Sequence, residues 1–211
     1  MGKKVLLIAA MALFLPIAAF ADSDISFTTN GGTLTANSSG LWVTGAQLVS
    51  INGLGGSFTG TDLGTLSIST GLMNAPGSVL SGATFRPGGP GSVMIVGNGS
   101  NGAPSGVLFS GAFTGNSTWT VTHPGANDNL YTFVGVATGQ LADGTVAVIQ
   151  ITFTVDKGTG LFVSPISLTG IPINTTSLSV PEPASLAFVG VGLVGLVAAF
   201  QRKRRSYISA S

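Results

Sequence analysis

The chain of 211 residues is poor in charge, with 7% Asp, Glu, Lys and Arg, and rich in glycine, with 32 residues. It contains no cysteine, which excludes disulfides, thiolate metal sites and cysteine nucleophiles. Six of the eight basic residues lie near the two ends, so residues 22–179 carry two basic and six acidic side chains, a net charge of −4. Nucleic-acid binding needs a clustered basic face, and this composition argues against it.

The first 21 residues have the three parts of a secretory signal peptide. Lys3 and Lys4 precede an apolar run over residues 5–15, which is too short for a permanent membrane anchor. A small-x-small pattern then comes before a polar segment, as signal peptidase requires. We therefore expect cleavage after residue 21, at a site formed by Ala19, Ala21 and Asp22.

The body of the chain, residues 22–170, is predicted to consist of short strands. Runs rich in Val, Ile, Thr and Phe are broken about every eight to twelve residues by Gly, Asn, Asp or Pro. This rhythm predicts an all-β fold, a single antiparallel β-sandwich of the jelly-roll or immunoglobulin-like type. Residues 171–179, rich in Ser, Thr, Pro and Asn, are expected to be a linker. The candidate strands are 25–29, 33–35, 41–51, 64–69, 79–85, 92–96, 106–113, 118–123, 130–138, 145–155 and 161–168.

The best-defined hairpin joins residues 130–138 to residues 145–155. Asp143-Gly144 lies between them, a dipeptide suited to a type I′ turn. Apolar and polar side chains alternate along the two strands and along residues 118–122, where Trp119 is expected inside and the threonines outside. The inward set predicted for the second strand is Ala147, Ile149, Ile151, Phe153 and Val155.

Residues that could carry chemistry are few, and the sequence predicts no enzyme, no cofactor and no metal site. His123 is the single histidine, and no nucleophile-elbow pattern accompanies it and Asp128. Residues 97–102 fit G-x-G-x-x-G, but no helix or acidic partner follows as a dinucleotide site requires. The segment 127–129 is a weak pattern for calcium. Most Asp residues lie at predicted turns, where Asp caps backbone amides.

A second apolar stretch, residues 184–200, is followed by a basic cluster. We expect this stretch to form a C-terminal transmembrane helix, which at about 25 Å would be at the short limit for spanning a bilayer. The cluster is expected to stay in the cytoplasm by the positive-inside rule, which leaves the body outside the inner membrane. Residues 206–211 form a short tail. The topology-determining residues are Arg202, Lys203, Arg204 and Arg205.

Four residues directly before this stretch carry a motif. Val180, Pro181, Glu182 and Pro183 precede the apolar segment and the basic cluster, and this three-part order over residues 180–205 resembles the PEP-CTERM sorting signal of Gram-negative bacteria. The resemblance implies processing by an exosortase, a membrane-embedded protease, and an association with exopolysaccharide. The prolines also stop the helix from extending upstream, so the segment stays extended for a protease. The alternative is a plain stalk before an anchor, and the tail is a departure from the family pattern.

These features together predict an exported protein of the cell surface or extracellular matrix. An inner-membrane-anchored precursor would be processed and then reach the outer surface or the medium. The expected partners are signal peptidase, an exosortase and extracellular polysaccharide. Two alternatives remain for the body: a carbohydrate- or ice-binding module, suggested by Thr-x-Thr arrays at 118–122 and 152–154, and a secreted hydrolase.

Overall fold

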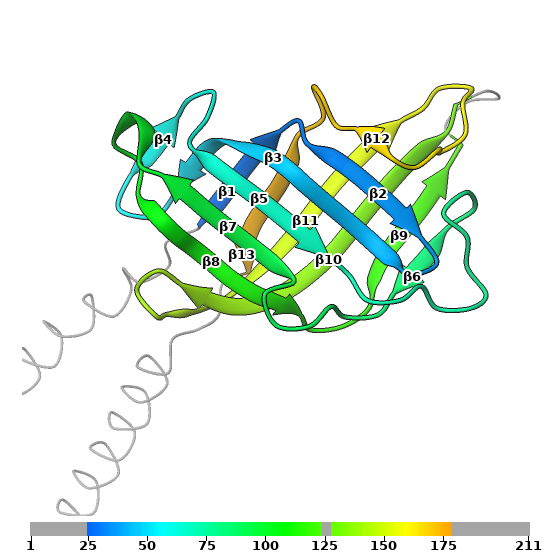
Figure 1. Ribbon diagram of the computed structural model, residues 1–211, viewed down its shortest axis with the longest axis horizontal. Coiled ribbons are helices and arrows are strands. Elements are labelled where there is room, and N and C mark those ends of the chain that lie inside the picture. The colour runs from blue at the N-terminus through cyan, green and yellow to red at the C-terminus, as the bar shows by residue number, and fades with distance from the viewer. Residues whose placement is uncertain (1–24, 124–127, 179–211) are drawn as a thin grey trace, which may run out of the picture. The chain divides into compact units, whose positions relative to one another are not determined.

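The computed structural model describes residues 25–123 and 128–178, which form an all-β domain with thirteen strands and one short 3₁₀ turn, Ser100–Gly102 (Figure 1). The all-β prediction is confirmed. The strands are β1 Ser26–Asn30, β2 Thr33–Asn37, β3 Gly40–Asn52, β4 Ser57–Thr59, β5 Gly64–Ser69, β6 Ala83–Phe85, β7 Val93–Asn98, β8 Ser105–Phe113, β9 Ser117–Thr122, β10 Leu130–Leu141, β11 Val146–Asp156, β12 Ile166–Ser167 and β13 Ile173–Leu178.

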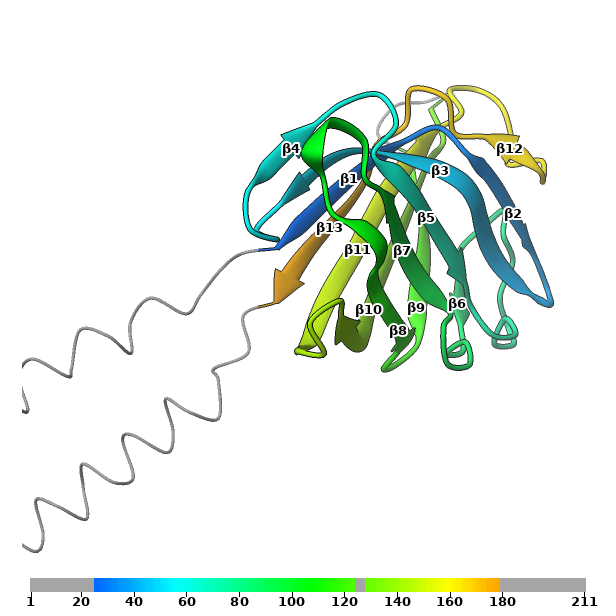
Figure 2. The ribbon, with the colours of Figure 1, turned by 60° about the vertical axis from the view of Figure 1, so that its left-hand side comes forward.

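Eight of these strands close into a barrel rather than forming a sandwich. The order is β1-β13-β11-β10-β8-β7-β5-β3, and β3 pairs with β1 again to close the ring, with every pairing antiparallel. Strands β2, β12, β4, β6 and β9 extend the barrel at its ends (Figure 2). The expected jelly-roll or immunoglobulin-like β-sandwich is therefore wrong. Inward and outward side chains alternate identically in both architectures, so alternation cannot distinguish them. The pairings of β1 with β13 and with β3, which close the row of strands into a ring, decide for a barrel.

The last strand lies where a linker was predicted, and residues 173–178 correct that expectation. Strand β13 pairs with β1 on one side and with β11 on the other. Its polar composition suggested a linker, but Ile173 and Thr175 point inward and are buried. The Oγ1 atom of Thr175 accepts a hydrogen bond from the Phe27 amide at 3.1 Å and donates to the Phe27 carbonyl at 3.2 Å. These bonds let a hydroxyl sit inside the wall without a desolvation penalty.

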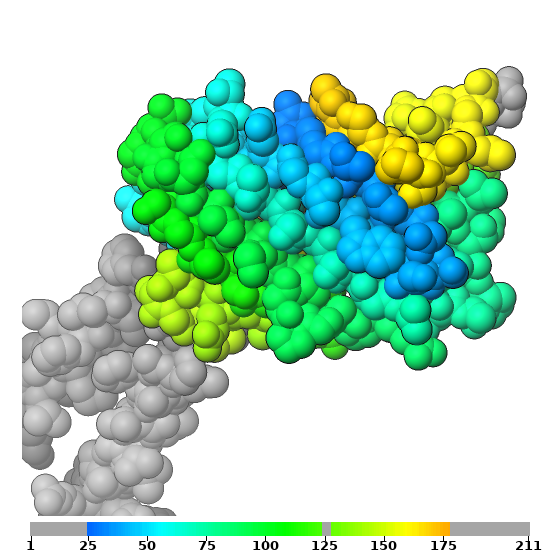
Figure 3. Space-filling model, in the orientation of Figure 1, coloured from blue at the N-terminus to red at the C-terminus, as the bar shows by residue number. Residues whose placement is uncertain are grey.

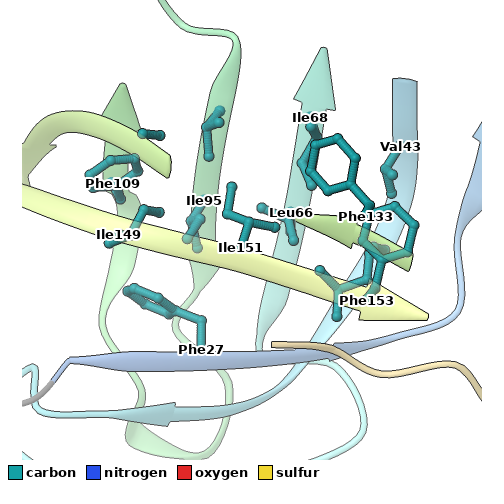
Figure 4. Packing of buried hydrophobic residues seen from close by; sticks show 14 of the residues in the cluster. Phe27, Val43, Leu66, Ile68, Ile95, Phe109, Phe133, Ile149, Ile151 and Phe153 are labelled. Atoms are coloured by element: carbon teal, nitrogen blue, oxygen red, sulfur yellow. The ribbon is translucent and has the colours of Figure 1, made fainter. Parts of the chain in front are cut away.

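The barrel interior is filled by one hydrophobic core. The whole inward set predicted for β11 is buried, and Trp119 is only 1% exposed, so both predictions are confirmed. Figure 4 shows Ile149 and Ile151 of β11 beside Ile95 and Leu66 of the facing wall, and Phe153 beside Phe133. Burying each such side chain stabilises the fold by about 1.5–3 kcal/mol relative to an exposed one.

Aromatic rings close one end of this core. Trp119 stacks on Tyr131 with ring centroids 5.6 Å apart, and Phe162 meets the Trp119 ring edge-on at 5.2 Å. The Phe162 amide donates to the Tyr131 hydroxyl at 3.2 Å. Phe162 was predicted to lie in a strand over residues 161–168, but only Ile166–Ser167 pair there. Phe162 is nevertheless only 3% exposed, so its ring packs in the core although the segment around it forms no strand.

Other differences from the expected strands occur where glycine or turn residues interrupt a run. Residues 79–85 form a strand only at 83–85, because Ser78 and Gly82 bond to each other and close a turn. Strand β4 lies in a Gly-rich segment and was not expected.

The β10–β11 turn also differs from the expected type I′ turn. The Gly144 amide donates to the Leu141 carbonyl at 2.9 Å, and only Gly144, not Asp143, has a positive φ, of 84°. A type I′ turn needs positive φ at both central residues, whereas this three-residue loop needs it once, at the glycine. The Asp143 Oδ1 atom accepts from the Thr145 amide at 2.9 Å, which stabilises the chosen turn.

Candidate functional site

The sequence-predicted signal residues lie outside the residues that the structure describes. These residues are Ala19, Ala21 and Asp22 for signal peptidase, Val180–Pro183 for sorting, and Arg202–Arg205 for topology. The predicted helix over 184–200 lies outside them as well. Over residues 25–123 and 128–178, no helix is long and apolar enough to cross a membrane.

The most distinctive surface of the barrel is its uncharged outer wall. Every Asp, Lys and Arg side chain among the described residues lies in a loop or at a strand end, which leaves the middle of each strand without charge. Figure 3 shows one side of this wall, where β2, β3, β5, β7 and β8 run as adjoining bands of packed side chains. The charged residues are Asp62, Arg86, Asp128, Asp143, Asp156 and Lys157.

On β11, β13, β1 and β3 this wall carries two neighbouring rows of hydroxyl and amide side chains. Residues directly opposite each other on paired strands share a face, so the pairing register places them side by side. We call these eight residues the neutral polar face. One row is Thr152, Asn174, Thr28 and Ser50, and the other is Gln150, Thr176, Ser26 and Asn52.

Side chains within the neutral polar face are only weakly bonded to one another. Thr28 Oγ1 donates to Asn174 Oδ1 at 3.4 Å, and Asn52 Nδ2 donates to Ser26 Oγ at 3.3 Å. These distances are longer than the usual 2.9 Å or so of a good protein hydrogen bond. Hydroxyl and amide groups that are weakly satisfied can exchange these contacts for water or for a ligand's hydroxyl groups.

The two predicted threonine arrays lie on adjoining parts of the wall. Strand β10 separates β9 from β11 and places Thr132 directly between Thr120 and Thr154. Thr132 and Thr154 share a hydrogen bond of 3.1 Å between their Oγ1 atoms. On β9, the Thr120 hydroxyl donates to a β10 carbonyl at 3.4 Å. Sequence reasoning found the arrays, but not the Thr132 bridge or the neutral polar face, because both depend on pairings between distant strands.

Residues considered for catalysis or metal binding do not form a recognisable site. His123 lies exposed just past the end of β9, and within the described part of the chain no three His, Asp or Glu side chains are close enough to hold a metal ion. Residues 97–102 run from β7 into the 3₁₀ turn, where the Asn98 side chain accepts from the Ser100 amide at 2.9 Å. This loop leads into strand β8, not into the helix that a dinucleotide would need.

Two of the aspartates cap turns, as predicted from their positions. Asp156 Oδ1 accepts from the Gly158 amide at 2.8 Å, and the Asp143 carboxylate caps the Thr145 amide. Hydrogen bonds from the backbone and side chain of Thr145 lower the pKa of Asp143 below its ordinary value, because they stabilise the charged form. These carboxylates stabilise turns and do not face each other as a catalytic pair.

Comparison with known proteins identifies one segment of the chain. Residues 179–205 match the family model of the PEP-CTERM protein-sorting motif, which confirms the predicted resemblance. The motif implies export, a membrane-anchored precursor and processing by an exosortase, which is a membrane protein. No curated protein matches the chain. No solved structure matches it either.

Proposed function

We propose that the chain is a non-enzymatic protein of a Gram-negative cell surface or extracellular matrix, whose barrel is the delivered cargo. The match of residues 179–205 to the sorting motif carries this proposal. A signal peptide over residues 1–21 starts export, and the apolar segment with its basic cluster holds the precursor in the inner membrane. An exosortase then processes the chain and sends the barrel to the outer surface or the medium.

Variants of the sorting motif test this function. Replacing Pro181 and Pro183 with Ala lets the helix extend upstream, because each proline costs a helix interior about 3 kcal/mol. Uncleaved precursor should then accumulate in the inner membrane with its body outside, as fractionation with an epitope near Asp22 would show. Pro90→Ala, in an exposed loop, is the matched control. Processing of the double variant at the normal rate would support a plain anchor instead.

The basic cluster has a separate role in this proposal. Neutralising the basic residues 202–205 removes the stop-transfer charge, so the chain should slip into the periplasm instead of accumulating in the membrane. The same fractionation distinguishes this outcome from that of the proline variants.

For the barrel itself, we propose that the neutral polar face binds an uncharged polysaccharide. The supporting observation is that two rows of hydroxyl and amide groups lie together on a wall without charge. Such groups can donate to and accept from sugar hydroxyls, and no fixed charge has to be desolvated. The ice-binding alternative has less support, because the strands of a closed barrel twist and tilt and do not present a flat array.

Binding of dextran, an uncharged polysaccharide, tests this second function. If the neutral polar face binds dextran, the fragment 22–178 should migrate more slowly in a native gel that contains dextran than in one without it. The double variant Thr28→Ala with Asn174→Ala should raise the dissociation constant obtained from this retardation about tenfold, as expected for the loss of two modest hydrogen bonds. Thr65→Ala with Ser67→Ala, on exposed positions of β5, is the matched control. Equal retardation of all three proteins would exclude this face as the binding surface.

A further inference from the structure

Strand β13 joins the folded barrel directly to the sorting motif. It ends at Leu178, and the residues matched by the motif begin at position 179. Only Ser179 and Val180 separate the last strand residue from Pro181. The segment that the processing enzyme must reach therefore begins almost immediately after the barrel ends.

Both edges of β13 are occupied. It pairs with β11 from Thr152↔Asn174 to Val148↔Leu178, and with β1 on its other side. Near its end the Ser177 amide donates to the Ile25 carbonyl at 2.7 Å. The Ile25 amide in turn donates to Ser177 Oγ at 2.9 Å. The end of the strand is thus held by backbone and side-chain bonds together.

A strand paired on both sides cannot also bind a protease cleft. Proteases take their substrates as extended segments whose backbone groups bond to the enzyme, as an added strand bonds to a sheet. The backbone groups of β13 already bond to β1 and β11, so they are unavailable until the strand end separates. While the barrel is closed, only Ser179 and Val180 lie between the paired strand and Pro181, so only these two upstream residues can bind to the enzyme.

Barrel closure is also a late event in export. The contact between Phe27 and Thr175 joins residues 148 positions apart, and the chain is exported from its N-terminus. Strand β13 can enter the barrel only after it has left the export channel, when the apolar segment that starts six residues after Leu178 has reached the membrane. Pairing of β13 and processing of the sorting motif therefore involve adjacent residues and occur at the same stage of export.

We propose that closure of the barrel by β13 restrains processing of the sorting motif. The closed seam limits the enzyme to Ser179 and Val180 upstream of Pro181, and faster processing requires the end of β13 to separate from β1 and β11. This inference rests on the proposed sorting function, since it concerns access to the same motif.

A linker inserted between Leu178 and Ser179 tests the restraint in the full-length chain. About eight Gly and Ser residues add flexible length there and leave residues 179–205 intact. In membrane vesicles that contain the exosortase, processing should become about tenfold faster, the factor expected from two modest hydrogen bonds that hold the strand end. The same linker after Gly115, in an exposed loop, should leave the rate unchanged. An unchanged or lower rate for the Leu178 insertion would overturn the proposal.

A substitution that loosens the strand end without added length gives a second test. Ser177→Ala removes the acceptor of the Ile25 amide and should also speed processing, whereas Thr176→Ala, on the exposed side of the same strand, should not. Equal rates for these two variants would count against the restraint. If the unaltered chain is not processed at all, or if the Pro181 and Pro183 variant is processed normally, the sorting function itself fails.

Discussion

Thr175 and Thr29 should respond in opposite ways to the same substitution by Val. Both are buried in the wall where β1 and β13 meet. Thr175 Oγ1 bonds to both backbone groups of Phe27, whereas Thr29 Oγ1 has no hydrogen-bond partner among the described residues. Valine has nearly the same shape as threonine, so the substitution changes the hydrogen bonding and leaves no large cavity.

The structure sets the sign and size of each change in the free energy of unfolding. Thr175→Val leaves the Phe27 amide without its side-chain acceptor and should destabilise the barrel by about 1–3 kcal/mol. Thr29→Val removes a buried hydroxyl that makes no hydrogen bond among the described residues, and should stabilise the barrel by about 1 kcal/mol. Thr176→Val, on the exposed side of β13, should change stability by less than about 0.5 kcal/mol.

Urea denaturation of the fragment 22–178, which contains all strands of the barrel, measures all three variants. Residues 24–178 form one compact unit, so this fragment can be studied alone. Trp119 is buried, and its fluorescence reports unfolding. With a slope of about 2 kcal/mol/M, the midpoint should fall by about 0.5–1.5 M for Thr175→Val. If Thr175→Val and Thr176→Val have the same midpoint, the side chain of Thr175 does not stabilise the seam and the reasoning is wrong.

Three further predictions concern single positions. The exported protein should begin at Asp22, and N-terminal sequencing that finds Met1 would refute the signal peptide. His123→Ala should leave the fold and any binding intact, and the loss of a hydrolytic activity in that variant would overturn the non-enzymatic proposal. The Asp143 carboxyl should titrate below its ordinary pKa of 3.8 in an NMR titration. The stabilising effect of the Asp143 carboxylate should therefore be fully present above about pH 3.8 and disappear as the pH falls through the lowered pKa. Thr145→Ala should bring the pKa of Asp143 closer to 3.8, because the substitution removes the Thr145 side-chain bond.

Features that depend on neighbours in the sequence could be predicted without the structure. The sorting motif is a linear order of prolines, apolar residues and basic charges, so residues 180–205 were identified from sequence alone and the family comparison confirms them. Most strands followed from alternation with a period of two, which also placed Trp119 and the inner side of β11 correctly. Asp143 and Gly144 marked a turn, although its type differed.

Features that depend on distant pairings were decided by the tertiary structure. Alternation says which side chains face a core but not which strands adjoin, so a barrel and a sandwich are equally compatible with it. The pairing of Phe27 with Thr175 closed the barrel and turned an expected linker into β13. The same pairings collected hydroxyl and amide groups from four strands into the neutral polar face. They also left only two residues of sequence between a strand paired on both sides and Pro181. Each of these outcomes depends on contacts between residues far apart in the chain, whereas the signals and most strands depend on local pattern alone.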